Sequence, residues 1–239
     1  LTHLITMSSA VIVLCYLTFR KLLPLWITLL LTLFAATGFY WSYPHPWYDQ
    51  SAYFWGILAL WFLMPRLPLK GARTAYAAGA LSGGCSVLSL LTKTNIGGAF
   101  GLAFFVYLLF ESERWRALLG FAVGALAAAA VMAVLIGAPA KYVEQALLSY
   151  GPTGTTQLVR FMFLPVWFKN LYWLPAIVIP LALGSERRLF RPHLALFYGI
   201  AGVGLFALNT GSLRGKDNLP LVPYFLGLGF IMLVESWKA

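Results

Sequence analysis

The stretch Tyr43-Pro44-His45-Pro46-Trp47-Tyr48-Asp49-Gln50 separates two long apolar runs. No charged residue occurs between Lys21 and Asp49, and none occurs again between Asp49 and Arg66. A helix that spans a membrane needs roughly 20 mainly apolar residues. Runs of this kind recur along the whole chain, so the pattern predicts a membrane protein built from helices.

The composition supports the same fold class. The chain has 239 residues, of which 61% are hydrophobic and 10% are charged, whereas soluble domains carry about 25% charged residues. The net charge is +10, but the basic residues stand singly or in short groups at the ends of the apolar runs. This placement favours membrane orientation and lipid headgroups over nucleic acid as the explanation of the charge. We predict an all-α polytopic transmembrane helical bundle that forms a single domain over residues 1–239.

Nine spans are expected, separated by polar, basic or proline-containing loops. The expected ranges are 4–19, 22–38, 51–64, 74–91, 96–110, 117–136, 161–183, 194–208 and 219–234.

The orientation follows from the basic residues in the loops. With the N-terminus outside, the expected inner loops hold 11 of the 17 Lys and Arg residues and the outer loops hold 6. Inner loops are usually the richer in Lys and Arg, so this orientation is the predicted one. The outer cations are Lys93, Lys141, Arg160, Lys169, Arg214 and Lys216, on the same face as Asp49.

Asp49 is the first candidate site residue. A carboxylate at a membrane boundary costs free energy unless it faces water, a partner or a ligand. Asp49 could cap the helix that follows it, and it could also bind a divalent cation or a polar sugar. His45 precedes it by four residues, but Pro46 lies between them, which disfavours a helical His/Asp metal pair.

Lys93 is the second candidate. It follows the glycine-containing span 74–91, in which Gly83 and Gly84 would allow close contact with another helix. Its ammonium group could extend along apolar surface into water, or it could bind a phosphate group as a point charge.

The third candidate is the cluster Arg214-Gly215-Lys216-Asp217-Asn218. It is either a solvated loop or an anion site for a lipid phosphate or pyrophosphate headgroup, to which Arg160 and Lys169 could contribute. There is no phosphate-binding loop, nucleophile elbow, CxxC or HExxH motif. Cys15 and Cys85 fall inside expected spans and are interpreted as packing residues.

The order of these features resembles the GT-C superfamily of membrane-embedded glycosyltransferases, in particular relatives of protein O-mannosyltransferases (family 39-like) and of the lipid A aminoarabinose transferase. The resemblance covers about residues 40–235. Three motifs carry it: the Pro/aromatic loop with Asp49, the glycine-rich helix that ends in Leu91-Thr92-Lys93, and the polar loop that runs into Leu219-Pro220-Leu221-Val222-Pro223.

This resemblance implies transfer of a sugar from a polyprenyl-phosphate donor to a lipid, glycan or protein acceptor on the outer face of the cell (inner or plasma) membrane. It implies no certain cofactor, and a divalent cation is left open. Asp49 would be a supporting acid, His45 and Tyr48 would lie on the acceptor side, and the donor phosphate would be bound by Lys93, Arg160, Arg214, Lys216 and Asp217.

The chain departs from the family pattern in one respect. The family's principal catalytic Asp usually lies in the first large outer loop, and no Asp or Glu precedes Asp49 here. We therefore expect a fragment that lacks the N-terminal span and this loop, and the activity of residues 1–239 alone is left open. The alternatives to a glycosyltransferase are a transporter or flippase for lipid-linked saccharides, or a non-catalytic membrane subunit.

Overall fold

The computed structural model describes residues 2–40, 48–137, 140–141, 144, 173–209 and 221–238. Every regular element in this part of the chain is a helix. The α-helices are α1 (Thr2–Phe19), α2 (Leu25–Tyr40), α3 (Tyr48–Leu63), α4 (Ala72–Thr92), α5 (Thr94–Leu109), α6 (Arg114–Ile136), α10 (Trp173–Leu183), α11 (Arg191–Asn209) and α12 (Val222–Ser236). Two 3₁₀ helices, η1 (Met64–Arg66) and η2 (Gly184–Arg188), complete the described elements.

The all-helical fold class is confirmed for the described residues, and a helix overlaps each of the nine expected spans. Helix ends shift by a few residues, as for 74–91, which is observed as Ala72–Thr92. The span expected at 161–183 is described only from Trp173 onward. Two of the described helices, α4 and α6, are long and apolar enough to cross a membrane. A bundle of nine spans is therefore not confirmed.

Proline and glycine mark the helix boundaries. Pro24 immediately precedes α2, and Pro223 lies in the first turn of α12, where the missing N–H of proline costs nothing. Gly137 ends α6 with φ at +70°, a left-handed conformation in which glycine has no Cβ penalty. These residues explain why the apolar runs break into separate helices.

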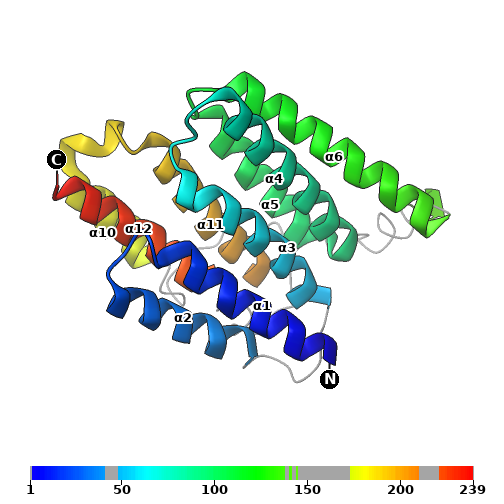
Figure 1. The fold of residues 1–239 in the computed structure, drawn as a ribbon, viewed down its shortest axis with the longest axis horizontal. Helices are drawn as coiled ribbons and strands as arrows, with labels where there is room; N and C mark the ends of the chain where they lie inside the picture. The colour runs from blue at the N-terminus through cyan, green and yellow to red at the C-terminus, as the bar shows by residue number, and fades with distance from the viewer. Residues whose placement is uncertain are drawn as a thin grey trace.

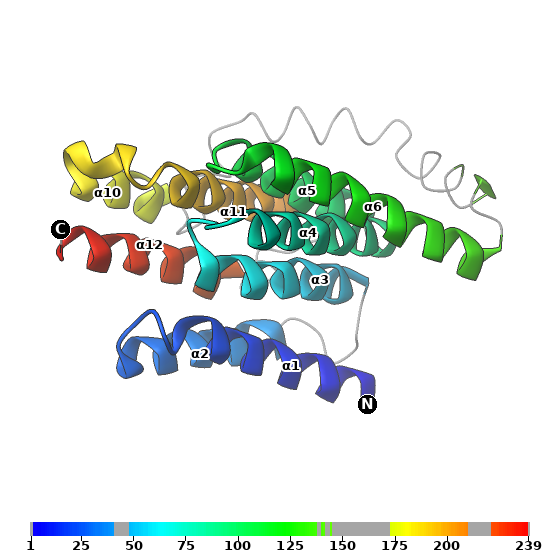
Figure 2. The ribbon, with the colours of Figure 1, turned by 45° about the horizontal axis from the view of Figure 1, so that its top comes forward.

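Consecutive helices run in opposite directions, so their connections alternate between two ends of the molecule (Figure 2). We call one of them the basic end; it holds the connections from α1 to α2, from α3 to α4, from α5 to α6 and from α10 to α11. All the cations expected in inner loops are exposed there: Arg20, Lys21, Arg66, Lys70, Arg73, Arg114, Arg116, Arg187, Arg188, Arg191 and Lys238. We call the other the Lys93 end; it holds the start of α3 and the turn from α4 to α5. Which side of a membrane each end faces stays a prediction.

The helices form layers around an aromatic core. The α1–α2 pair lies in the layer below α3, while α4, α5 and α6 lie above α3 (Figure 2). Tyr53 of α3 meets the ring of Phe100 edge-on at 6.2 Å between centroids, and Phe100 stacks on Phe104 at 5.7 Å. The two cysteines are buried in α1 and α4 and are not joined in a disulfide, as expected for packing residues.

Helices α4 and α6 pack against each other through glycine residues on both helices. A Cβ atom on Gly79 or Gly83 would overlap backbone carbonyl oxygens of α6, and one on Gly120 or Gly124 would overlap those of α4. Small residues of this kind let two backbones approach directly. We call these four glycines the α4–α6 seam. The expectation of close contact at Gly83 is confirmed, while at Gly84 a Cβ would make only ordinary contact, 3.5 Å from the Gly124 oxygen.

Two helices are displaced along the bundle axis. Tyr224, in the first turn of α12, packs against Phe19, the last residue of α1, with ring centroids 5.8 Å apart. From there α12 continues away from α1, and the C-terminus lies beyond the α1–α2 connection (Figure 1). The start of α12 is therefore level with the basic end of α1, and α10, which packs beside α12, shares this displacement.

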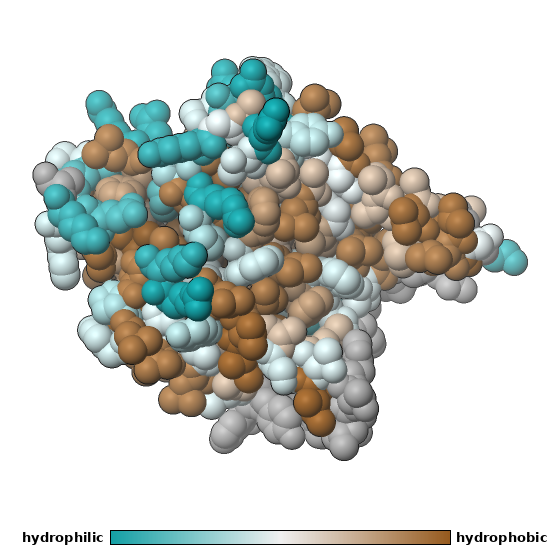
Figure 3. Space-filling model, in the orientation of Figure 1, coloured by the Kyte–Doolittle hydropathy of each residue, from teal (hydrophilic) through white to brown (hydrophobic). Residues whose placement is uncertain are grey.

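The surface of α6 is strongly apolar. Leu126 is 70% exposed and Val134 is 82% exposed. Figure 3 shows hydrophobic residues over this helix, whereas hydrophilic residues gather toward the basic end on the face that is visible. Such an exposed apolar surface needs a cover, and a lipid bilayer is one.

Candidate functional site

The candidate site lies at the Lys93 end, where α3 begins and α4 gives way to α5. Tyr48 and Asp49 belong to the first turn of α3, and Lys93 stands between α4 and α5. The other residues predicted for the site lie outside the described residues: His45, Arg160, Arg214, Lys216 and Asp217. Their predicted roles stay predictions, as do those of the Tyr48 and Asp49 side chains.

One hydrogen bond brings the two described segments together. The Ser89 hydroxyl donates to the carbonyl oxygen of Ala52, at 2.9 Å and in a buried position. Ser89 is one turn before Lys93, and Ala52 is one turn after the start of α3. The first turn of α3 and the Lys93 turn therefore lie next to each other, although about forty residues separate them in the chain.

Polar groups are buried at this end. Gln50 is 5% exposed, Asn95 is 8% exposed and Ser89 is fully buried. The Asn95 side-chain oxygen accepts the backbone N–H of Ile96, at 2.9 Å. Burial of polar groups costs free energy unless they are hydrogen-bonded, so their concentration beside a break between two helices is the mark of a structured polar site.

Lys93 departs from the interpretation as a lysine that extends into water. Its ammonium nitrogen is buried. Its backbone is extended, with φ −152° and ψ 110°, and its N–H donates to the Ser89 oxygen at 2.8 Å. A buried ammonium is stable only where an anion or hydrogen-bond acceptors offset its lost hydration, and the predicted contact with a phosphate group is one way to meet this need.

The serines of α4 are a simpler case. Ser82 donates to the Gly79 oxygen at 2.9 Å, and Ser86 donates to the Ser82 oxygen at 2.7 Å. Both hydroxyls thus donate within their own helix, so we do not assign them to ligand binding.

Sequence reasoning missed Glu111, which it placed in a short polar turn. Glu111 is only 3% exposed and lies at the basic end. One carboxylate oxygen accepts the backbone N–H of Leu69 at 3.0 Å, and the other accepts the hydroxyl of Tyr107 at 2.7 Å. Burial raises the pKa of this carboxyl above its usual value. The spacing of Tyr107 and Glu111, four residues apart at a helix end, was the available signal.

Glu111 is an architectural residue rather than a second site. It joins the connection before α4 to the end of α5, which positions α4 relative to its neighbours. Among the described residues there is no group of three or more His, Cys, Asp and Glu side chains that could hold a metal ion.

Comparison of the chain with protein-family models, with curated proteins and with solved structures finds no match.

Proposed function

We propose that this protein is a multi-pass membrane glycosyltransferase that moves a sugar from a polyprenyl-phosphate donor to an acceptor at the Lys93 end. The observation that carries the proposal is the hydrogen bond from Ser89 to Ala52, because it sets the turn that bears Asp49 beside the turn that bears Lys93. An acid and a cation at one membrane boundary are the pair that this transfer needs.

The proposed chemistry is a displacement at the anomeric carbon of the sugar. The acceptor oxygen forms a bond to that carbon, and the bond from the carbon to the phosphate oxygen breaks. The phosphate leaves with the electron pair, and a carboxylate takes the acceptor proton. Lys93 stabilises the charge that grows on the phosphate, since a preplaced cation is most effective where charge develops.

The remaining predicted residues complete this scheme. Arg160, Arg214, Lys216 and Asp217 bind the donor phosphate, His45 and Tyr48 face the acceptor, and Asp49 is the supporting acid. The apolar surface of α6 and the exposed cations of the basic end support placement across a cell membrane with the basic end inside.

Sugar transfer in proteoliposomes tests the proposal directly. With a radiolabelled polyprenyl-phosphate sugar, Asp49→Asn and Lys93→Ala should each lower transfer at least tenfold while the protein still inserts. Lys141→Ala is the matched control, because Lys141 is an exposed cation on the same predicted side. Normal transfer by both variants would remove Asp49 and Lys93 from the site.

The same assay separates the alternative of a transporter or flippase. A flippase would move the intact lipid-linked saccharide across the membrane, and the label would stay on the polyprenyl phosphate. Orientation has its own test: a thiol reagent applied from outside should label Gly154→Cys and not Lys70→Cys, and the reverse pattern would invert the proposed topology. The native Cys15 and Cys85 are buried and should give little background.

A further inference from the structure

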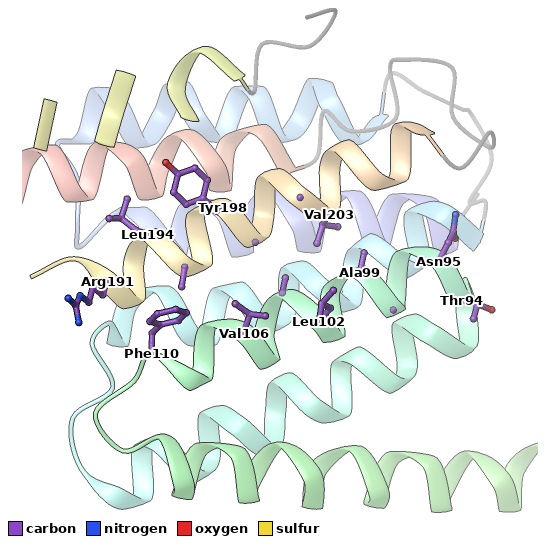
Figure 4. A pocket seen from close by; sticks show the side chains of 15 residues that line it. Thr94, Asn95, Ala99, Leu102, Val106, Phe110, Arg191, Leu194, Tyr198 and Val203 are labelled. Carbon is purple, nitrogen blue, oxygen red and sulfur yellow. The ribbon is translucent and has the colours of Figure 1, made fainter. Parts of the chain in front are cut away.

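A groove of about 960 Å³ runs between α5 and α11. Figure 4 shows its side chains along the two helices, from Thr94 and Asn95 at the Lys93 end to Phe110 and Arg191 at the basic end. Apart from its two ends, the groove is lined by apolar residues. At its Lys93 end the groove shares Asn95 with the polar residues of the candidate site, and the rest of it lies outside the α3–α4 pairing.

Glycines give the groove its width. A Cβ added to Gly202 of α11 would meet no atom within 4 Å, and one added to Gly98 of α5 would meet only the end of Leu90, at 3.9 Å. Space is therefore left beside these two glycines, whereas a Cβ on Gly199 of the same groove would lie 3.0 Å from the Cβ of Ala103, so the two helices approach closely there.

The length of the groove suits a linear chain. From Asn95 to Phe110, α5 rises by about 22 Å at 1.5 Å per residue. The hydrocarbon core of a bilayer is about 30 Å thick. A hydrocarbon chain that lies parallel to the helices could therefore be covered over most of one crossing.

The charge at the groove is one-sided. Arg191 lines its basic end and is exposed, and Arg187 and Arg188 of η2 come shortly before it in the chain. The lining at the Lys93 end, Thr94 and Asn95, is neutral, and none of the described residues that line the groove is acidic. This arrangement complements an amphiphile whose anionic group is at the basic end.

We propose that this groove binds an acyl chain of an anionic phospholipid, with the lipid phosphate on Arg191. The proposal rests on the membrane placement of the proposed function but not on sugar transfer. A polyprenyl-phosphate donor would place its phosphate at the opposite end, near Lys93, so the position of Arg191 favours a phospholipid of the leaflet at the basic end.

Binding can be measured on the whole protein, purified in detergent and stripped of lipid. The probe is phosphatidylglycerol, compared with zwitterionic phosphatidylcholine, and bound lipid is counted by native mass spectrometry. Gly202→Leu should weaken binding of phosphatidylglycerol about tenfold, because the new side chain displaces about two methylene groups of the lipid from the groove. Ala130→Leu, on the exposed surface of α6, is the matched control and should bind normally.

The headgroup contact has a separate variant. Arg191→Gln should weaken phosphatidylglycerol about fivefold and remove the preference over phosphatidylcholine, since a cation near the membrane surface contributes about 1 kcal/mol toward an anionic lipid. Arg20→Gln, at the same end but away from the groove, should leave the preference intact. If Gly202→Leu does not fold, Gly98→Leu fills the groove from the opposite wall.

The outcomes are decisive in either direction. Normal phosphatidylglycerol binding by both Gly202→Leu and Gly98→Leu would overturn the proposal, as would an unchanged lipid preference in Arg191→Gln. Polyprenyl phosphate that fills the groove independently of Arg191 would assign it to the donor instead. Dimerisation that Gly202→Leu abolishes, without any effect on lipid, would assign it to a second copy of the chain. Loss of sugar transfer alone would not affect the assignment.

Discussion

The α4–α6 seam and the α5–α11 groove both depend on glycine, but they use it in opposite ways. At the seam, Gly79, Gly83, Gly120 and Gly124 let one backbone lie directly against the other. In the groove, Gly202 borders open space, and a Cβ on Gly98 would meet only the end of the Leu90 side chain. A glycine in an apolar helix therefore has no fixed meaning, since the atoms opposite it decide whether it permits contact or leaves room.

Side-chain hydrogen bonds also differ between the surroundings of α4 and the groove. Glu111 and Ser89 each tie α4 or its leading loop to another element. The groove is lined on both sides by apolar side chains, and the Tyr198 hydroxyl at its edge donates to Ala176 of α10 rather than across to α5. Helix α4 is thus joined to its neighbours by backbone contact and buried hydrogen bonds, whereas the described lining of the groove is mostly apolar.

The largest effect on stability is expected when a methyl group is added to a glycine of the α4–α6 seam. In Gly120→Ala the new Cβ would overlap the carbonyl oxygen of Tyr76, which is backbone and cannot rotate away. Overpacking of this kind costs about 1–3 kcal/mol or more, and thermal unfolding in detergent would report it. Gly84→Ala, on the same helix pair but with ordinary contacts, is the control and should be at least as stable as the parent protein.

Removal of Glu111 comes next. In Glu111→Ala the Leu69 N–H and the Tyr107 hydroxyl lose a buried acceptor, which costs about 1–3 kcal/mol. Glu113→Ala removes a carboxylate from the partly exposed pair with Arg116 and should change stability by less than about 1 kcal/mol. Equal effects in denaturant unfolding would show that the burial of Glu111 is of no consequence.

Titration of Glu111 should make the free energy of unfolding depend on pH. Burial raises the Glu111 pKa above the ordinary value of 4.5, so the folded protein holds this proton at pH values where the unfolded chain has lost it. The resulting stability is complete below the unfolded pKa and is lost as the pH rises through the folded pKa. Unfolding measured upward from pH 4 should show this decline, and Glu111→Gln should lack it.

A smaller loss of stability is expected when the hydrogen bond between Ser89 of α4 and Ala52 of α3 is removed. Ser89→Ala removes the donor to Ala52 and should cost about 1 kcal/mol. Ser86→Ala is the matched control, because its hydroxyl bonds within α4, and it should cost less. Sugar transfer should fall in Ser89→Ala alone, because the Ser89 bond joins α4 to α3 beside the Lys93 turn whereas the Ser86 bond stays within α4; equal transfer in the two variants would contradict this.

The smallest effect has the opposite sign. Gly202→Ala adds a methyl group into open space and removes a flexible residue from a helix, which should stabilise the protein by about 0.5–1 kcal/mol. Loss of stability here, of the size expected at Gly120, would mean that the groove is as closely packed as the seam.

The sequence was informative about elements and weak about their pairing. Apolar runs and their breaks at Arg20-Lys21 and at Gly137 located the helices, because these signals are local. Close contact at Gly83 was also predicted, but its partner in α6 was not. That pairing depends on which faces meet after folding, which no single run of residues encodes.

The site shows the same limit. The placement of Lys93 at the same end as the start of α3 was predicted by alternating the spans. The burial of its ammonium nitrogen was not, since the same lysine pattern occurs in side chains that extend into water. Glu111 was assigned only to a short polar turn, because its acceptor role depends on Leu69, more than forty residues away.

The displacement of α12 has a mechanical consequence. In the proposed membrane placement, a bilayer centred on α4 and α6 would meet α12 off-centre, because α12 starts beside the last residue of α1. The lipid around α10 and α12 would then have to bend or thicken to cover their apolar surface, at a cost of fractions of a kcal/mol per ångström of mismatch. The protein would therefore prefer regions of particular membrane thickness, and bilayers of different acyl length should change its stability.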